Sequence, residues 1–313
     1  MKKRNTRNCV CICAWVFISM LPRHANAQFY FYDDTHYDSD LLIELGVSAG
    51  GMNCITDLGG KRGTGKKFIK DINWNNTKLC GGFFISAMYK SVIGVRAEAS
   101  FGKVTAYDSI LRNQNTPPTG RYERNLNFRS SIYELALLAE FHPLFLKNYF
   151  DDDAPRLSPY IAAGAGLFTF SPQTYYDGRW VNLHPLHTEG QGFAELPERK
   201  PYRLTQLNFP VGAGIKYDIN HLFNARFEIL YRILKTDYLD DASTTYINPS
   251  LFYNNLPPGI ASLAEKLHDR SGELIAGMKQ SPGAIRGDPK DNDAYFSFQV
   301  KLAFTLGRGR ARM

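Results

Sequence analysis

Residues Tyr295–Leu306 read YFSFQVKLAFTL and alternate without a break between apolar and polar side chains. Neighbouring side chains of a β-strand point to opposite sides of a sheet, so one face of this segment is apolar and the other is polar, with Lys301 at its centre. About ten residues are enough for a tilted strand to cross a bilayer. An apolar outer face combined with a polar inner face is typical of a strand in a membrane β-barrel.

Seven further segments show the same alternation. They are residues 42–54, 80–89, 93–102, a run that ends at Phe141, 160–170, 207–218 and 223–236. In the second of these segments an aromatic residue, Phe84, falls on the polar face. The fifth segment is so rich in small residues that its facing is ambiguous.

The connections between these segments alternate in length. Residues 90–92 and 219–222 form short links, whereas the links at 55–79, 105–122, 171–206 and 237–294 are long. Outer-membrane barrels have short periplasmic turns and longer external loops. One link departs from this rule, because residues 143–158, with Asp151 to Asp153, would be a medium-length periplasmic turn. We therefore expect an all-β fold, an eight-stranded antiparallel transmembrane β-barrel with long extracellular loops.

A soluble β-sandwich or a lipocalin-like barrel also alternates, and periodicity alone does not exclude it. In such a protein the apolar face would be the inside, and the charged residues would lie in solvent. The start of the chain favours the membrane. It has a basic stretch from Lys2 to Arg7, an apolar run from Cys9 to Leu21, and the small-residue cleavage site Ala25-Asn26-Ala27, as in a secretory signal peptide.

The expected organisation has four parts. Residues 1–27 are the signal peptide, 28–41 a periplasmic N-terminal segment, 42–308 the outer-membrane barrel, and 309–313 a basic C-terminal tail. A retained amphipathic anchor is the alternative for the first part. Without residues 1–27 the formal net charge falls from +7 to +2, with 32 basic against 30 acidic residues, so we expect no nucleic-acid partner.

The polar faces of the strands carry charges of both signs. Eight strands enclose an interior that side chains just fill, and buried charges must pair. We therefore expect a salt-bridged plug, with a selective pore as the alternative. The expected members are Glu44, Arg96, Glu98, Glu134, Glu140, Lys216, Arg226, Glu228, Arg232 and Lys301.

The sequence indicates neither a catalytic site nor a cofactor site, and we expect a non-enzymatic protein. The stretch Gly60–Lys66 imitates a phosphate-binding loop but lacks the following Ser or Thr and the α/β context. His184 and His187 have no evident third ligand, and the aspartates between Asp288 and Asp293 lack the spacing of a calcium loop. No metal site is expected.

Two cysteines remain after removal of the signal peptide. Cys54 ends the first predicted strand and Cys80 begins the second, and both have inward parity. A disulfide between them is one expectation, and two free, packed thiols are the alternative.

An acidic motif follows the seventh predicted strand. Carboxylates at this point could cap the barrel mouth by accepting backbone hydrogen bonds, although a solvated acidic turn is the alternative. A short helix is expected at Leu263–Leu267 in the same loop. The motif residues are Asp237, Tyr238, Asp240 and Asp241.

Several stretches resemble the PorG-like outer-membrane barrel family of the Bacteroidota. They are Glu44–Asn53 with Asp57, Thr236–Tyr246, Leu267–Ser271 and Arg286–Asp293. The resemblance implies an outer-membrane location and, for some members, an accessory role in type IX protein secretion beside periplasmic subunits. The expected partners are thus outer-membrane lipid and periplasmic type IX secretion subunits. A structural or adhesive surface barrel and a narrow channel are the alternatives, and the oligomeric state is open.

Overall fold

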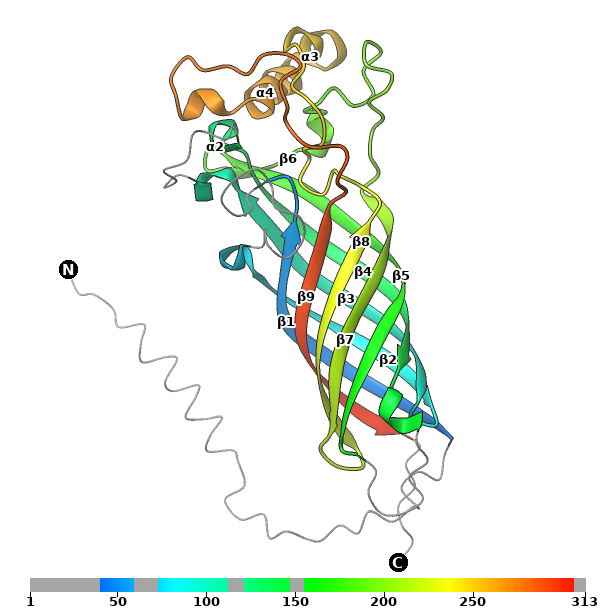
Figure 1. Cartoon of the computed structure of the whole chain (residues 1–313). Helices are drawn as coiled ribbons and strands as arrows, with labels where there is room; N and C mark the ends of the chain where they lie inside the picture. The colour runs from blue at the N-terminus through cyan, green and yellow to red at the C-terminus, as the bar shows by residue number, and fades with distance from the viewer. Residues whose placement is uncertain (1–39, 59–72, 112–120, 147–154, 307–313) are drawn as a thin grey trace, which may run out of the picture.

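The computed structural model describes residues 40–58, 73–111, 121–146 and 155–306. The predicted signal peptide, the basic tail, most of the segment 28–41, the Gly60–Lys66 stretch and Asp151–Asp153 lie outside the described residues. Eight antiparallel strands form a closed barrel, in which β1 pairs with β9 and β4 pairs with β5, so the predicted fold class is confirmed (Figure 1). The barrel strands are β1 (Leu41–Ile55), β2 (Lys78–Tyr89), β3 (Ile93–Tyr107), β4 (Asn127–Phe141), β5 (Leu157–Tyr176), β7 (Thr205–Asp218), β8 (Phe223–Leu234) and β9 (Ala294–Leu306).

The outer face of the wall is apolar. Phe83 on β2 and Leu135 on β4 are 62% and 67% exposed, whereas their neighbours Phe84 and Glu134 are buried. In a soluble barrel the apolar side chains would be inside, so that alternative is wrong. The facing of β5, which the sequence left ambiguous, places Tyr160 and Phe168 inside.

Several strands differ from their expected bounds. β3 continues to Tyr107 and β5 to Tyr176, while β8 ends at Leu234. The alternation continues past Gly102, where Val104 and Ala106 are buried, and the ladder between β3 and β4 continues with it. The short strand β6 (Arg179–Asn182) pairs with the far end of β5 beyond the barrel.

In the described part of the chain, the long connections carry all the helices except η5 (Pro143–Leu146), which follows β4. Among the described helices, none is both long enough and apolar enough to cross a membrane. The expected helix at Leu263–Leu267 lies within a longer one, which begins at Pro258 because proline suits the first turn. The helices described in these connections are η3 (Trp74–Asn76), η4 (Asp108–Leu111), α2 (Arg121–Arg124), η6 (His184–Leu186), α3 (Ser250–Asn255), α4 (Pro258–His268) and η7 (Ser271–Glu273).

The loops after β5 and β8 fold together into a cap at one end of the barrel (Figure 1). The cap has its own apolar core, in which Phe193 packs edge-on against Phe252 at 6.0 Å between ring centroids. Leu183 and Leu186 join this core from one loop, and Leu267 joins it from the other.

One ladder of the barrel wall is interrupted. β5 and β7 pair continuously from Leu157 to Ala163 and again from Gly166 to Thr169, in one register. That register sets the missing positions opposite Phe209 and Pro210. Proline has no N–H to donate, which explains a break at this point.

Candidate functional site

The barrel interior holds the ten charged residues expected there. All ten are at most 5% exposed, and five are basic and five are acidic. The strand alternation brings them inward, because each lies on the face opposite the apolar outer wall. The two signs therefore balance among these ten residues.

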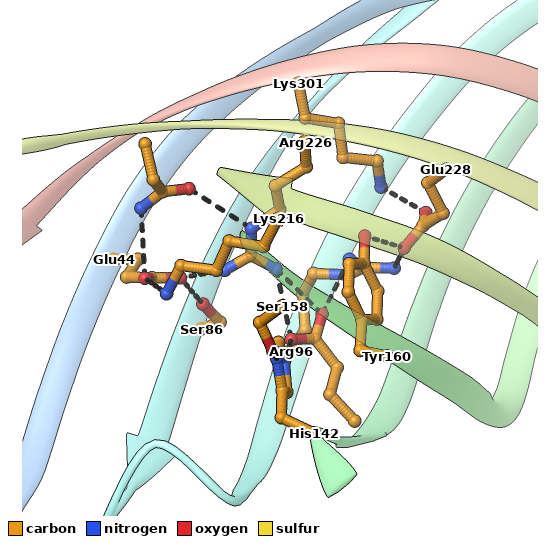
Figure 2. A network of polar contacts seen from close by, with 12 residues as sticks. Glu44, Ser86, Arg96, His142, Ser158, Tyr160, Lys216, Arg226, Glu228 and Lys301 are labelled. Atoms are coloured by element: carbon orange, nitrogen blue, oxygen red, sulfur yellow. Dashed lines mark hydrogen bonds and ion pairs between the residues drawn. The ribbon is translucent and has the colours of Figure 1, made fainter. Parts of the chain in front are cut away.

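Arg96 on β3 is the centre of the network. Its guanidinium contacts Glu140 at 2.6 Å, Glu228 at 2.8 Å and Glu98 at 3.0 Å. Lys301 on β9 contacts Glu98 at 2.5 Å and Glu228 at 2.7 Å. Because these residues come from β3, β4, β8 and β9, the ion pairs connect opposite sides of the wall across the lumen (Figure 2).

Glu44 on β1 is a second centre, nearer the short turns. Its carboxylate contacts Lys216 at 2.6 Å and also pairs with Arg226. The hydroxyl of Ser86 donates to the same carboxylate at 3.1 Å. Arg226 also contacts Glu140 at 3.0 Å, so the two centres form one network (Figure 2).

A separate pair lies towards the cap. Arg232 on β8 contacts Glu134 on β4 at 3.1 Å. The amide of Asn208 donates to Glu134 at 2.7 Å and to the hydroxyl of Tyr295 at 2.8 Å. This pair completes the set, so each of the ten expected residues has an oppositely charged partner within the lumen.

The contacts of Tyr160 and Phe84 with the network were not predicted. The hydroxyl of Tyr160 donates to Glu228 at 2.8 Å, and the Tyr160 ring stacks on His142 at 4.9 Å. The ring of Phe84, which the sequence placed inward as an unexplained aromatic, lies 5.3–5.7 Å from the charged groups of Arg226, Lys301 and Arg96. Cation–π attraction explains why an aromatic belongs among these charges.

An apolar layer lies on the cap side of the charged layer. Phe128, Ile132 and Phe168 fill the interior there with Met52, and Leu239 joins them from the loop after β8. The described lumen is therefore filled by two layers, one ionic and one apolar. This packing supports the expected plug over the selective pore.

The acidic motif after β8 is at the root of the cap. Asp240 accepts hydrogen bonds from the backbone N–H groups of Leu58, at 3.1 Å, and Ala242, at 3.0 Å. Asp241 accepts from the hydroxyls of Thr188, at 2.5 Å, and Tyr202, at 2.6 Å. These contacts are the capping that the sequence suggested for Asp240, whereas Asp241 is held by side chains.

Burial raises the pKa of every carboxyl in the motif. The pKa of Asp241 rises to about 6, because burial outweighs the nearby Arg286. The pKa of Asp240 rises to about 8 and that of Asp237 to about 10, through burial and then repulsion from Asp57. Crowded carboxyl groups therefore meet at the barrel mouth.

The cap contains a hub that the sequence did not single out as a site. Glu189 pairs with Arg286 at 2.9 Å and accepts hydrogen bonds from the backbone N–H groups of Ser243 and Thr244, each at 3.0 Å. Nothing near Glu189 in the sequence marks it, because Ser243, Thr244 and Arg286 are all more than fifty residues away. The hub joins the loop after β5 to the loop after β8.

The expected Cys54–Cys80 disulfide is not formed, and both thiols are buried and free. The register pairs Cys80 with Gly50 and Cys54 with Tyr295. Four residues of a strand separate the two positions by roughly 13 Å, well beyond the ~7 Å that a disulfide allows between Cα atoms. The prediction was wrong because the ends of β1 and β2 are staggered.

Within the described residues, no three His, Cys, Asp or Glu side chains form a group that could hold a metal ion. His184 and His187 lie 6.4 Å apart between ring centroids, and a ring nitrogen of His184 is 3.0 Å from the carbonyl oxygen of Tyr202. Asp293 is buried, whereas Asp288 and Asp291 are exposed.

The fold is that of an outer-membrane β-barrel. No protein-family model and no curated protein matches the chain. Among solved structures, it is similar to Ail of Yersinia pestis in complex with the heparin analogue sucrose octasulfate, with 8% identity, a TM-score of 0.37, and coverage of 86% of this chain and 100% of Ail. It is also similar to OprG of Pseudomonas aeruginosa, with 11% identity, a TM-score of 0.36, and coverage of 88% and 99%. Outer Membrane Protein W of E. coli has 14% identity, a TM-score of 0.31, and coverage of 84% and 97%.

Proposed function

We propose that the chain spans an outer membrane as a sealed β-barrel and acts without catalysis, as a scaffold for interactions. The main observation behind this proposal is the barrel wall, which is apolar outside and ionic inside, the reverse of a soluble barrel. An apolar belt around a whole barrel needs lipid, because exposing so much apolar surface to water is unfavourable. The cap and the long loops lie outside the cell, and the short turns face the periplasm.

The filled lumen favours an interaction role over a narrow channel. Ions crossing the barrel would have to separate Arg96 from its three carboxylates and then pass the apolar layer around Phe168. Separating a buried ion pair is costly, since each charge left behind is unpaired.

The resemblance to PorG-like barrels supports an accessory role in type IX protein secretion. In that role the periplasmic subunits meet the short-turn end, where Leu146 in η5 is 64% exposed. An adhesive surface barrel is the second candidate. The separate apolar core of the cap favours it, since exposed apolar side chains such as Ile285, at 77%, are thereby presented on a folded support.

The test begins with location. The unboiled protein should be recovered with outer membranes and migrate on a denaturing gel at a position that changes on boiling. Recovery as a soluble periplasmic protein contradicts the proposal. In planar bilayers the purified barrel should give no steady conductance, and a steady open state contradicts the sealed barrel.

Photo-crosslinking separates the two interaction roles. A crosslinking amino acid replaces Leu146 at the short-turn end in one variant and Ile285 in the cap in the other. Capture of periplasmic secretion subunits from Leu146 but not from Ile285 supports the secretion role. Capture of surface or host components from Ile285 alone supports the adhesive role.

A further inference from the structure

The outer wall is hollowed where β2, β3 and β4 approach the cap, beneath β6. The hollow has a volume of about 650 Å³. Its edge towards the apolar belt is formed by Leu79, Phe101 and Tyr133, which are 89%, 48% and 64% exposed. Its edge towards the cap carries Lys103 and Arg129, so the hollow joins an apolar surface to a basic one.

Strand register places the basic residues side by side. In the ladder between β3 and β4, Lys103 pairs with Ser131 and Thr105 pairs with Arg129. All four have the outward parity of Phe101, so their side chains share one face of the sheet. Lys78, at the exposed start of β2, adds a third positive charge to the lining.

The Arg129 guanidinium is held in place by neutral groups. Its Nε donates to the Oε1 of Gln173 at 2.9 Å, and its Cζ lies 3.9 Å from the ring centroid of Trp180. Trp180 in turn packs against Tyr175 at 5.3 Å between ring centroids. The ring and the amide orient the guanidinium but carry no charge of their own.

The basic residues of the hollow differ from those in the lumen. The lumen arginines and lysines all contact carboxylates, whereas Lys78, Lys103 and Arg129 form no ion pair with any acidic residue in the described part of the chain. Three unpaired positive charges around one hollow attract an anion. An oriented guanidinium beside ammonium groups is suited to phosphate in particular.

We propose that this hollow binds the phosphorylated headgroup of an outer-leaflet glycolipid. The inference rests on the proposed outer-membrane location. The acyl chains of the lipid lie along the apolar belt below Leu79 and Phe101, and its phosphate lies between Lys103 and Arg129. Ser131 offers its hydroxyl to the sugar. A free phosphate ion would leave the apolar edge of the hollow uncovered, which is why a lipid is the better occupant.

A similar combination of basic and apolar side chains is found elsewhere at the cap end of the wall. A second hollow, of about 670 Å³, lies against β7 and is lined by Leu207, Phe209, Arg203 and Lys235. The ammonium group of Lys235 lies 5.7 Å from the ring centroid of Phe209. Basic and apolar side chains thus meet at the cap end of the wall in two places, as expected for a barrel surrounded by anionic headgroups at that level.

The test measures lipid binding to the full barrel in nonionic detergent. Bisphosphorylated lipid A is titrated by thermophoresis, with dephosphorylated lipid A, phosphatidylglycerol and inorganic phosphate as separate probes. The variant replaces Lys78, Lys103 and Arg129 with Gln. The control replaces Lys90, Lys279 and Lys290, which are exposed outside the hollow, with Gln and so loses the same charge.

Bisphosphorylated lipid A should bind the wild type and the control alike, and the hollow variant should bind it at least about tenfold more weakly. Equal binding by the two variants overturns the proposal, as does equal binding of dephosphorylated lipid A. Competition by millimolar inorganic phosphate would assign the hollow to free phosphate, and an equal preference for phosphatidylglycerol would assign it to anionic lipid in general. Either result overturns the glycolipid assignment.

A second measurement locates the ligand. Replacing Trp74 with Phe leaves Trp180 as the only tryptophan after residue 27. Its emission should shift on addition of bisphosphorylated lipid A, and an unchanged emission contradicts binding in the hollow. Heat-modifiable migration of each variant shows independently that the barrel is inserted, so failure of the lipid site is distinguishable from failure of the proposed location.

Discussion

Arg96 contacts three carboxylates at once in the middle of the barrel. An arginine can do this because its planar guanidinium presents five N–H groups in a fixed fork. Replacing it with lysine would keep the charge but lose the geometry. The interior is therefore specified by the shapes of its ionic groups as well as by their signs.

Reversal of one lumen charge tests this arrangement. Arg226→Glu places a third carboxylate against Glu44 and Glu140, and loss of a buried partner costs about 3–5 kcal/mol. The variant should lose its heat-modifiable form at a lower temperature than the wild type. Lys290→Glu, an exposed reversal of the same sign, should leave the transition unchanged. If both variants melt alike, the ion pairs do not support the barrel.

The sequence could predict which residues enter the lumen but could not predict which contacts they make. A period of two assigns Arg96 and Glu228 to the inner face whatever the barrel geometry. The contacts of Tyr160 and Phe84 could be assigned only from the structure, because their partners lie on other strands. The disulfide prediction was wrong for a similar reason, since Cys54 and Cys80 point to the same face but lie at different positions along their strands. The hub of Glu189 and Arg286 depends on how the loops fold, and loops lack the sequence periodicity that identifies strands.

Among the elements, the loop after β8 combines a structural role with an electrostatic cost. Its carboxyls hold the backbone at the barrel mouth while repelling one another. A carboxyl whose folded-state pKa lies above its unfolded value binds its proton more tightly in the folded state. Stability from such a group is complete below the unfolded pKa and declines as the pH rises towards the folded pKa.

The cap should therefore loosen between pH 6.5 and pH 9. Asp240, with a pKa of about 8, and Asp237, with a pKa of about 10, both lose protons less readily when folded. His268, with a pKa lowered to about 4 by burial, stays neutral throughout this window and does not oppose the effect.

Limited proteolysis of the loop between Leu234 and Ala294 measures this loosening. Asp237→Asn combined with Asp240→Asn should reduce the increase in cleavage at high pH, because the amides carry no charge to bury. Asp291→Asn, an exposed change in the same loop, should keep it. A cleavage rate in the wild type that is independent of pH would show that the carboxyls are not under strain.

At the scale of the whole molecule, the two larger apolar cores lie in different parts of the protein. One fills the cap side of the barrel, and the other lies within the cap. The first includes Leu239 and Ala242 from the loop after β8, so the root of the cap belongs to the barrel. The outer part of the cap packs on itself and can open locally without the barrel.

Truncation of one aromatic in each core should separate the two units. Phe252→Ala in the cap and Phe168→Ala in the barrel each remove a fully buried ring and should each cost about 3–5 kcal/mol. Phe252→Ala should increase proteolysis of the cap and leave the heat-modifiable transition where it is. Phe168→Ala should lower that transition. A lowered transition in both variants would show that cap and barrel unfold as one.

The break opposite Pro210 gives the closed wall a seam, which has a consequence for its dynamics. The closed sheet should open locally where it has the fewest hydrogen bonds, so we expect transient opening between β5 and β7. In hydrogen-exchange measurements on the barrel in detergent, the amide of Gly164, which faces Pro210, should exchange faster than those along β1 and β9, whose ladder runs unbroken from Ile43 to Ile55. Pro210→Ala restores a donor and should slow this exchange, and an unchanged rate would mean that the seam is held shut by the side chains on either side.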